Sequence, residues 1–389
     1  MAIFSRKIRL GVIGRKESFN KITSSINEND KVIWIHCSSL GEYEQGLPII
    51  KKLKEKYNSH KIVLTFLSPS GYEVKKTSSE VDLVIYLPLD SNRNAKKFIK
   101  ALDPELVVFV KNEIWPNYLK YIKKYKIKSA LVCGLFKKDD IKFSWPFNFL
   151  ANSILKFDYV LVQDEESKNT IQSLGHNNTH VCGDTRFDRV DSTSSQDDSI
   201  KYIDQFKSDK LCLVAGSIWK EDQIILVDYI NSSKENIKFI LAPHEIDKNK
   251  INSLRNSISK PSILYSEISE YNINRNVLII DNVGMLARLY KYANLAYIGG
   301  AMGSSGLHNT LEPAAFGIPI IIGKNYSKFP EAKKMISLGG MFSVNNLQEF
   351  EKHVESFTRS KLTAGEIGQI NLNFILKNKG ATNKIMNYL

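Results

Sequence analysis

The sequence contains little cysteine, and neither cysteine nor histidine occurs in a pattern typical of a metal site. Its 389 residues include four cysteines and seven histidines, with no CxxC pair and no HExxH spacing. Scattered cysteines argue against a disulfide framework and favour a reducing compartment. The adjacent acidic pairs Asp139-Asp140 and Asp197-Asp198 are expected to be solvated rather than to bind a cation. We therefore predict no metal site and no cofactor.

Long apolar runs are also missing. No stretch of 18 consecutive apolar residues occurs, so the sequence predicts no transmembrane helix. Residues 1–16 are basic and mildly amphipathic, and they lack the apolar core and cleavage site of a signal peptide. Such a segment can lie on an anionic bilayer surface, or it can be merely solvated.

Acidic residues are fewer than basic ones, with 41 Asp and Glu against 54 Lys and Arg. The formal net charge is +13, with lysine spread along the whole chain, and this balance favours anionic partners such as nucleic acid, anionic membrane or phosphorylated substrates. No nucleic-acid-binding motif accompanies the charge, so nucleic acid is not an expected partner. The hydrophobic content of 43% is sufficient for the buried cores of two domains.

Short apolar runs alternate with helical segments along most of the chain. In the first half we expect strands at 31–37, 62–67, 83–87, 106–110, 129–135, 159–162 and 180–182. In the second half we expect them at 211–215, 239–242, 277–280, 295–298 and 318–322. This alternation predicts an α/β protein with parallel, doubly wound sheets, in which ligands gather at the carboxyl ends of the strands. The polar segment 191–210 is the expected linker.

Residues 295–325 carry the most information. An expected strand leads into a glycine- and serine-rich loop at 299–306, and then into the string HNTLEP and a short helix that Gly317 ends. Backbone N–H groups of such a loop and of a helix N-terminus can approach a phosphate. Asn309 is expected to cap the helix, and Glu312 to reach a ligand hydroxyl or the backbone. An ordinary capped helix has the same glycine pattern, so the loop alone does not decide between the two.

Three charged side chains follow expected strands of the first half. Glu42 lies in an expected turn after 31–37, Glu113 follows 106–110, and Arg186 follows the last strand. Each alone can simply face water or favour a helix dipole. If the sheet is parallel, however, all three converge on one rim, as a general base and charge stabilisers require.

Further candidates follow strands of the second half. Gly216-Ser217 can hold a phosphate through a backbone N–H and a hydroxyl. Pro243-His244 can stack on, or hydrogen-bond to, a base or a phosphate, although His244 alone fits a surface loop equally well. Residues 284–286 begin an expected helix and can present backbone groups to a nucleobase.

These strings together resemble the GT-B glycosyltransferases, and more narrowly the 3-deoxy-D-manno-octulosonate (Kdo) transferases of lipopolysaccharide synthesis. In the first half the resemblance lies in SxGE after a WIH strand, SPSG (68–71), YLPLD (86–90), NEIWPN (112–117), VQDEES (162–167) and GDTRFD (183–188). In the second half it lies in GS-x-W, APHE, DNVG-x-L and GG-x(7)-HN-x-LEP-A-x(2)-G-x-P. It covers roughly residues 30–345.

The resemblance implies a GT-B fold of two Rossmann-like doubly wound domains that face a central cleft. An acceptor-binding domain would span 1–190, a linker 191–210 and a CMP-sugar-binding domain 211–364, and a final helix at 365–389 would pack back on the first domain. The family's catalytic base maps onto Glu42. Two residues thought to support its transition state map onto Glu113 and Arg186, while Lys111 stands where many members have another glutamate.

The family's contacts to CMP also map onto this sequence. The matching positions are Ser217, Pro243, His244, Gly284, Met285, Leu286, Asn309, Thr310, Leu311 and Glu312. His244 departs from the pattern, because many members have arginine directly after that proline.

The function that the resemblance implies is an inverting, metal-independent transfer of Kdo from CMP-Kdo to a lipid A precursor (lipid IVA). The expected partners are CMP-Kdo, the lipid A precursor and the anionic inner-membrane surface. Family members usually begin with a hydrophobic anchor, and this sequence does not, so either attachment to the cytoplasmic face of the bacterial inner membrane would be peripheral or the N-terminus is shortened.

Two alternatives remain open at this point. Another GT-B nucleotide-sugar transferase or an epimerase would share the architecture of the second half, but an epimerase would not need an apolar acceptor surface. A non-enzymatic module that binds membrane or nucleic acid would tolerate loss of Glu42 and Asn309. Selective thermal stabilisation by CMP, by UDP or by neither nucleotide distinguishes these alternatives.

Overall fold

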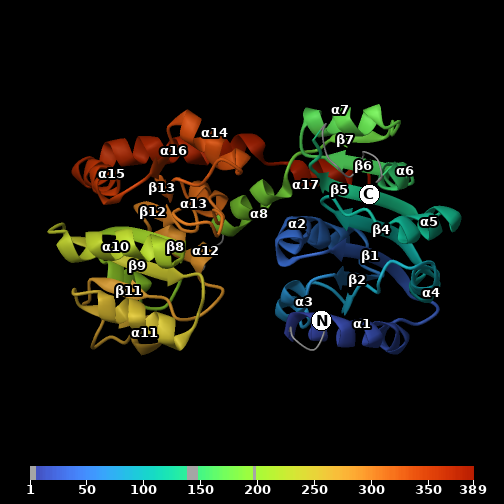
Figure 1. Ribbon diagram of the computed structural model, residues 1–389, viewed down its shortest axis with the longest axis horizontal. Coiled ribbons are helices and arrows are strands. Elements are labelled where there is room, and N and C mark those ends of the chain that lie inside the picture. The colour runs from blue at the N-terminus through green and yellow to red at the C-terminus, as the bar shows by residue number, and fades with distance from the viewer. Residues whose placement is uncertain (1–5, 138–147, 196–198) are drawn as a thin grey trace. The chain divides into compact units, whose positions relative to one another are not determined.

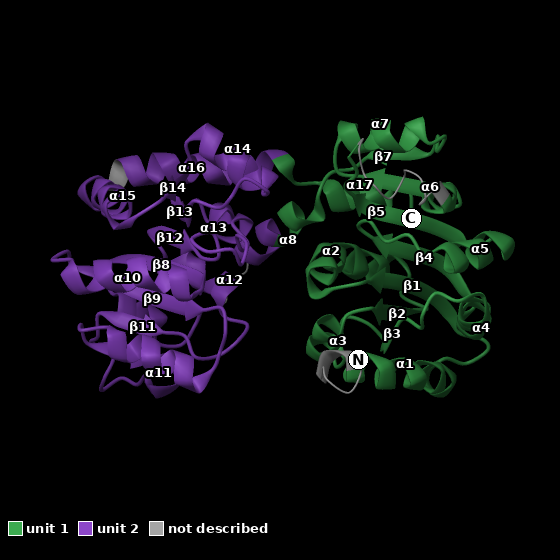
Figure 2. Ribbon diagram, viewed as in Figure 1, with its two compact units in different colours: residues 1–189, 378–389 green, residues 190–377 purple. Residues whose placement is uncertain are grey.

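The computed structural model describes residues 6–137, 148–195 and 199–389 of the chain (Figure 1). The chain forms two compact units (Figure 2). Unit 1 comprises residues 1–189 and 378–389, and unit 2 comprises residues 190–377. The two acidic pairs that were expected to be solvated, at 139–140 and 197–198, lie outside the described residues.

Unit 1 is built on a parallel seven-stranded sheet with the order β3-β2-β1-β4-β5-β6-β7. Its strands are β1 (Lys31–Cys37), β2 (His60–Phe66), β3 (Leu83–Tyr86), β4 (Pro104–Val110), β5 (Lys128–Gly134), β6 (Tyr159–Val162) and β7 (Thr179–Val181). The order reverses direction between β1 and β4, which makes their carboxyl ends the topological switch point of the sheet.

Helices cover both faces of this sheet (Figure 1). They are α1 (Arg6–Ser25), α2 (Leu40–Lys56), α3 (Pro69–Lys75), α4 (Asn92–Leu102), α5 (Pro116–Lys124), α6 (Asn148–Ile154), α7 (Glu165–Ser173) and α17 (Ala381–Met386). Helix α8 (Thr185–Ser194) begins in unit 1 and ends in unit 2. Alternate residues of β1 enter opposite cores: Ile33 and Ile35 pack with α2, α3 and α17, whereas Val32 and Trp34 pack with α1, α4 and α5. This two-sided burial explains why β1 is apolar along its length.

The end of the chain is fixed to unit 1 by polar contacts. The carboxylate of Asp188 accepts hydrogen bonds from the N–H of Gly380 at 2.5 Å and from the N–H and hydroxyl of Thr382, both at 2.6 Å. The carbonyl oxygen of Leu389 accepts from the Tyr57 hydroxyl at 2.8 Å and from the Lys128 ammonium at 2.9 Å. Asp188 therefore satisfies backbone donors at the start of α17.

Unit 2 has a second parallel seven-stranded sheet, with the order β10-β11-β9-β8-β12-β13-β14. Its strands are β8 (Leu211–Ile218), β9 (Ile237–Pro243), β10 (Ser262–Leu264), β11 (Val277–Ile279), β12 (Leu295–Ile298), β13 (Ile320–Gly323) and β14 (Met341–Val344). The switch point here lies between β8 and β12.

The helices of unit 2 include two short 3₁₀ segments. They are α9 (Ile203–Lys207), α10 (Lys220–Ser232), α11 (Lys248–Ser257), η2 (Tyr265–Glu267), α12 (Leu286–Leu289), η3 (Tyr290–Tyr292), α13 (Leu311–Ala315), α14 (Pro330–Leu338), α15 (Leu347–Arg359) and α16 (Lys361–Asn378). Helices α10, α11 and α15 pack on one face of the sheet around Phe239 and Tyr297. No helix in the described ranges is both long and apolar enough to cross a membrane.

The predicted fold class is confirmed: the protein is α/β, with two parallel, doubly wound sheets. Several local expectations were wrong. Glu42 lies in the first turn of α2 rather than in a turn before it, because Ser39 caps a helix that starts at Leu40. Ser217 lies within β8 rather than beyond its end. The polar segment 191–210 is not a plain linker, because it includes helix α9. The side chains of Ile203 and Phe206 in this helix are buried.

Candidate active site

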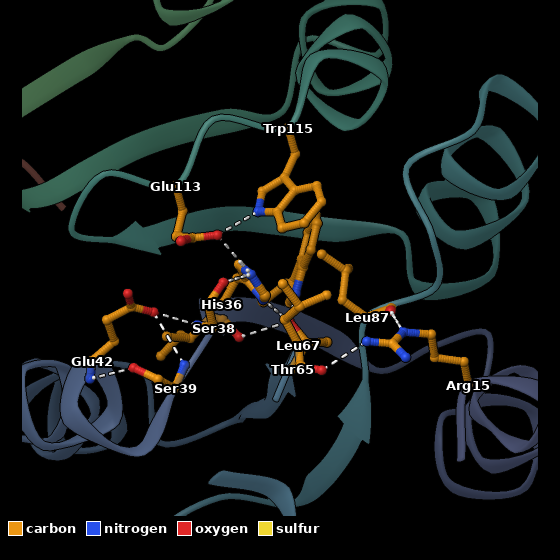
Figure 3. Close-up of polar contacts among 12 residues, drawn as sticks. Arg15, His36, Ser38, Ser39, Glu42, Thr65, Leu67, Leu87, Glu113 and Trp115 are labelled. Carbon is orange, nitrogen blue, oxygen red and sulfur yellow. Dashed lines mark hydrogen bonds and ion pairs between the residues drawn. The ribbon is translucent and has the colours of Figure 1, made fainter. Parts of the chain in front are cut away.

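The carboxyl ends of β1 and β4, the switch-point strands of unit 1, carry Glu42 and Glu113. Glu42 follows β1 in the first turn of α2, and Glu113 follows β4 directly before α5. Because these strands are neighbours in a parallel sheet, both carboxylates lie at one rim (Figure 3). The predicted convergence of these two residues follows from the strand order.

Glu42 belongs to a capping box. Its Oε2 accepts hydrogen bonds from the backbone N–H of Ser38 at 2.5 Å and of Ser39 at 3.2 Å, while the Ser39 hydroxyl accepts from the N–H of Glu42 at 3.4 Å. Burial raises the pKa of Glu42 to about 7, and the nearby charge of Glu113 adds to this, against the hydrogen bond from Ser38 and the charge of Lys111. A carboxylate with this pKa can both accept and release a proton near neutral pH.

Glu113 is held as an anion. Its Oε2 accepts a hydrogen bond from Nε1 of Trp115 at 2.8 Å and lies 3.4 Å from Nε2 of His36 (Figure 3). Burial acts to raise the pKa of Glu113, but the hydrogen bond and charge of His36, together with hydrogen bonds from Ser38 and Trp115, lower it below its ordinary value. The two rim carboxylates thus differ in proton affinity, with Glu42 the stronger base.

Arg186 follows β7 in the first turn of α8. Its Nε lies 2.8 Å from Oδ2 of Asp184, as does one terminal nitrogen, and its backbone N–H donates to Oδ1 of Asp184 at 2.9 Å. The same Oδ1 accepts from Nε2 of Gln45 in α2 at 2.9 Å. Asp184, which is 7% exposed, therefore fixes the orientation of the guanidinium, and sequence reasoning did not find it.

In unit 2, five of the predicted CMP-binding residues line one pocket of about 170 Å³ at the carboxyl edge of the sheet. These five are Ser217, Pro243, His244, Gly284 and Leu286. Ser217 has a φ of +53°, which is unusual for a residue with a side chain. Strained backbone conformations of this kind are concentrated at active sites and ligand-binding sites. Met285 lies beside the pocket residues as the N-cap of α12 and is 7% exposed.

The glycine loop after β12 is fixed by Asp222 of α10. One oxygen of this fully buried carboxylate accepts from the N–H of Gly300 and of Trp219, each at 2.8 Å, and the other accepts from the Tyr297 hydroxyl at 2.8 Å. Gly300 has a φ of +94°, and a Cβ there would collide with the carbonyl of Gly306. Asp222 was also missed, because nothing in the sequence pairs it with a loop 78 residues further on.

Three aromatic rings pack together at the edge of the predicted donor site. The centroids of Trp219 and His244 lie 4.4 Å apart, as do those of His244 and His308. The indole N–H of Trp219 donates to Nε2 of His308 at 2.8 Å. Burial and the charge of His244 lower the pKa of His308 to about 4, so the ring is a neutral acceptor at physiological pH.

The remaining predicted CMP contacts lie around the start of α13. Oδ1 of Asn309 accepts from the N–H of Leu311 at 3.1 Å, and its Nδ2 donates to Oε1 of Glu312 at 3.0 Å. Asn309 had been expected as the N-cap of α13, but the N-cap residue is Thr310. The Thr310 hydroxyl is buried and has no hydrogen-bond partner among the described residues.

Within the described ranges, no three His, Cys, Asp or Glu side chains lie close enough together to hold a metal ion. Of the three charged residues expected on one rim of unit 1, the structure brings Glu42 and Glu113 together at the ends of β1 and β4, whereas Arg186 follows the edge strand β7. In unit 2, predicted CMP contacts lie at the carboxyl ends of the strands. Two doubly wound units, with predicted site residues at the carboxyl ends of their strands, have the architecture of the GT-B fold.

Solved structures support this class. The chain matches UDP-GlcNAc 2-epimerase from Neisseria meningitidis bound to UDP-GlcNAc with a TM-score of 0.63 and 14% identity, over 92% of this chain and 99% of that one. It matches a glycosyltransferase from Rickettsia africae ESF-5 with a TM-score of 0.59 and 14% identity, over 92% and 98%. At these identities the likeness shows the fold alone.

The chain belongs to the 3-deoxy-D-manno-octulosonic acid (Kdo) transferase family, and it is therefore a glycosyltransferase. A family model described as 3-Deoxy-D-manno-octulosonic-acid transferase (kdotransferase) matches residues 10–189. The 3-deoxy-D-manno-octulosonic acid transferase of Aquifex aeolicus is 30% identical over 330 residues, which are 82% of this chain and 83% of that protein.

Other relatives agree. The 3-deoxy-D-manno-octulosonic acid transferase of Haemophilus influenzae is 26% identical over 92% of this chain and 86% of its own length. A bifunctional glycosyltransferase/methyltransferase of Fusobacterium nucleatum is 28% identical over 87% of this chain, which spans 54% of that longer protein.

Proposed function

We propose that the protein transfers Kdo from CMP-Kdo to a lipid A precursor, lipid IVA, with inversion at the anomeric carbon and with Glu42 as the general base. The observation that carries this proposal is the carboxylate of Glu42 at the switch point of unit 1, with its pKa raised to about 7, in a chain of the Kdo transferase family. A base with this pKa suits proton abstraction from a sugar hydroxyl near neutral pH.

The reaction is a single displacement. Glu42 takes the proton of the acceptor hydroxyl while the hydroxyl oxygen forms a bond to the anomeric carbon of Kdo. The bond between that carbon and the phosphate oxygen breaks, and CMP leaves with the bonding electron pair. Attack from the face opposite the leaving group inverts the configuration.

Negative charge develops on the CMP phosphate as the bond breaks. Arg186, oriented by Asp184, is a fixed cation that can stabilise such charge. In unit 2 we assign CMP to the pocket lined by Ser217, Pro243 and His244 and to the segment from Asn309 to Glu312. The N–H groups of the glycine loop that Asp222 holds add donors for the phosphate.

We further propose that the protein works as a peripheral enzyme at the cytoplasmic face of the inner membrane. Helix α1 supports this, because it exposes Val12 and Ile13 (43% and 47% exposed) beside the basic residues Arg9 and Lys16. A helix with apolar and basic residues on its surface can lie on an anionic bilayer.

The experiment that tests the proposal is incubation of the enzyme with CMP-Kdo and lipid IVA, with mass spectrometry of the lipid and NMR of the new glycosidic bond. We expect lipid IVA to gain Kdo, CMP to appear in equal amount, and the product to have the inverted configuration. UDP-GlcNAc serves as the alternative donor. Turnover of UDP-GlcNAc without any use of CMP-Kdo would overturn the donor assignment.

A further inference from the structure

His36 lies beneath the two rim carboxylates and has no part in the proposed transfer. It is the sixth residue of β1, and its side chain is completely buried. It joins two sets of polar groups: Nδ1 lies 2.8 Å from the Thr65 hydroxyl of β2, whereas Nε2 lies 3.2 Å from the Ser38 hydroxyl and 3.4 Å from Glu113 (Figure 3). A fully buried imidazole with a partner at each nitrogen has a defined orientation.

The hydrogen bonds of Thr65 indicate where the imidazole carries its hydrogen. Its hydroxyl oxygen accepts from Nε1 of Trp34 at 2.9 Å, and its single hydrogen can go either to the carbonyl of Ile35, 3.4 Å away, or to Nδ1 of His36. If it goes to Nδ1, Nε2 must carry the hydrogen of the ring. If it goes to Ile35, Nδ1 is the donor, and the lone pair of Nε2 can accept from the Ser38 hydroxyl, 3.2 Å away, but also faces the Glu113 carboxylate. The proximity of the carboxylate therefore favours the tautomer in which Nε2 carries the hydrogen and donates toward Glu113.

The ring is also held sterically. The Phe109 ring of β4 and the Trp115 ring lie edge-on to it, with centroids 5.6 Å and 5.7 Å away. Trp115 in addition donates to the same oxygen of Glu113 that His36 faces. His36 and Trp115 therefore fix this carboxylate from two sides, and Ser38 connects the pair to Glu42 because its backbone N–H donates to the Glu42 carboxylate.

We propose that His36 is a positioning residue that keeps Glu113 ionised and fixed beside Glu42, and that it thereby sets the pH range in which Glu42 accepts the proton of the acceptor hydroxyl. This inference rests on the proposed role of Glu42. A fixed negative charge near Glu42 makes that carboxylate a stronger base. Without His36, the partly buried Glu113 would take up a proton more readily, and the negative charge that acts on Glu42 would be lost.

The other charged and titratable groups around this pair act in defined directions. Lys111, directly after β4, lowers the pKa of Glu42 and so opposes the effect of Glu113. Burial, followed by the charges of Glu42 and Glu113, raises the pKa of the Cys37 thiol well above its ordinary value, with smaller contributions from Cys133 and Glu44. The thiol is therefore neutral at physiological pH, and Glu113 is the charge through which His36 acts on Glu42.

Two substitutions of different length separate the roles of the ring. In His36→Asn the amide can replace Nδ1 toward Thr65 but is too short to reach Glu113. In His36→Gln the amide nitrogen can replace Nε2 and still donate to Glu113, without a positive charge. The matched control is His60→Gln. His60 makes a comparable contact of 2.9 Å to Glu105, but at the amino-terminal ends of the strands of the same sheet, away from Glu42 and Glu113.

The pH dependence of kcat/KM for Kdo transfer tests the proposal. In the wild-type enzyme the acid limb reports Glu42. We expect His36→Asn to move this limb to lower pH and to lower the plateau rate, His36→Gln to move it less, and His60→Gln to leave it in place. Glu113→Gln should move the limb in the same direction as His36→Asn, and the double variant should move it no further than Glu113→Gln alone.

A measurement that needs no turnover separates this inference from the proposed function. In enzyme labelled with ¹³C at glutamate carboxyls, the resonance of Glu42 is the one lost in Glu42→Gln. Its titration midpoint should fall in His36→Asn, even in a preparation that transfers no Kdo. An unchanged Glu42 midpoint in both His36 variants, each shown to be folded by circular dichroism, would overturn the proposal whether or not transfer is observed.

Discussion

Trp219 donates its indole N–H to Nε2 of His308, 89 residues further along the chain, over 2.8 Å. This contact joins the start of α10 to the segment that precedes α13, the two segments of unit 2 that carry most of the predicted phosphate-binding groups. It also requires His308 to be neutral, since a protonated imidazole has no free lone pair to accept the hydrogen bond.

The neutrality of His308 makes unit 2 sensitive to acid. The pKa of His308 is about 4 in the folded protein, below the ordinary 6.5, so the unfolded state binds more protons between these values. The contribution to stability is therefore complete above about pH 6.5 and is lost as the pH falls toward 4. We expect His308→Gln, whose amide oxygen can accept from Trp219, to lose less stability than the wild type between pH 7 and pH 4.5. Urea unfolding at each pH measures this. Parallel loss in both proteins would show that His308 is not the group responsible.

The raised pKa of Glu42 predicts the pH dependence of the wild-type reaction. As the base, Glu42 must be ionised before it can accept a proton, so kcat/KM should rise with pH through about 7 and level off above it. Initial rates of CMP release in buffers of constant ionic strength give this profile. A limb centred near the ordinary glutamate value would mean that another group, or an unperturbed Glu42, limits the reaction.

Asp184 should matter to transfer through Arg186. Removal of the cation in Arg186→Ala should lower the transfer rate by about 100-fold or more, as does loss of other groups that stabilise transition-state charge. Asp184→Asn keeps the cation but removes the carboxylate that orients it, so the rate should fall in the same direction and by less. The control is Arg189→Ala, because Arg189 pairs with Glu44 at 2.7 Å rather than with Asp184. If Asp184→Asn retains full activity, the ion pair does not position Arg186 for catalysis.

Asp222 should determine how well unit 2 binds CMP. An asparagine presents an amide nitrogen in place of one carboxylate oxygen, so it cannot accept from Gly300, Trp219 and Tyr297 together as the aspartate does. We expect Asp222→Asn to weaken CMP binding by about tenfold, or about 1.4 kcal/mol, as measured by calorimetry. Tyr297→Phe removes only the hydroxyl and should weaken binding less. Equal CMP affinity in Asp222→Asn and the wild type would show that the contacts of Asp222 to the glycine loop do not contribute to nucleotide binding.

Asp188 should fix the end of the chain. Its carboxylate accepts three hydrogen bonds from Gly380 and Thr382, so Asp188→Ala should destabilise the docking of α17 by about 2 kcal/mol. Hydrogen exchange of residues 381–389 should become faster than in the wild type, and Asp188→Asn, which keeps one acceptor oxygen, should lie between the two. Unchanged exchange in Asp188→Ala would show that the apolar contacts of Ile385 and Leu389 suffice.

The seven strands of unit 1 and five of the seven strands of unit 2 could be predicted from the sequence, because each of these buried strands is a short apolar run. The residues at the strand ends could be located for the same reason. The strands β10 and β14 were missed, because they lie at the two edges of the sheet of unit 2 and are only partly buried. The ends of the elements were predicted less accurately. The cap by Ser39 makes α2 start at Leu40, two residues before Glu42. Strand β8 continues through Ser217 because it pairs with β9 up to Pro243.

The groups that support the site could not be predicted from the sequence, because each works through a partner that is distant along the chain. Asp222 contacts Gly300, and Thr65 contacts His36 from a neighbouring strand. Asp184 follows β7 but is fixed by Gln45 of α2. The roles of these residues depend on which strands are neighbours, and an apolar pattern along one chain does not specify that order.

The central claim is that Glu42 removes the proton of the acceptor hydroxyl in a transfer from CMP-Kdo. The most direct test compares Glu42→Gln with Glu55→Gln, a variant of an exposed glutamate on the same helix that pairs with Lys52. We predict that Glu42→Gln lowers Kdo transfer to lipid IVA by about 10²- to 10⁴-fold while CMP binding stays at the wild-type level, and that Glu55→Gln transfers Kdo normally. Transfer by Glu42→Gln at the rate of Glu55→Gln would contradict the claim.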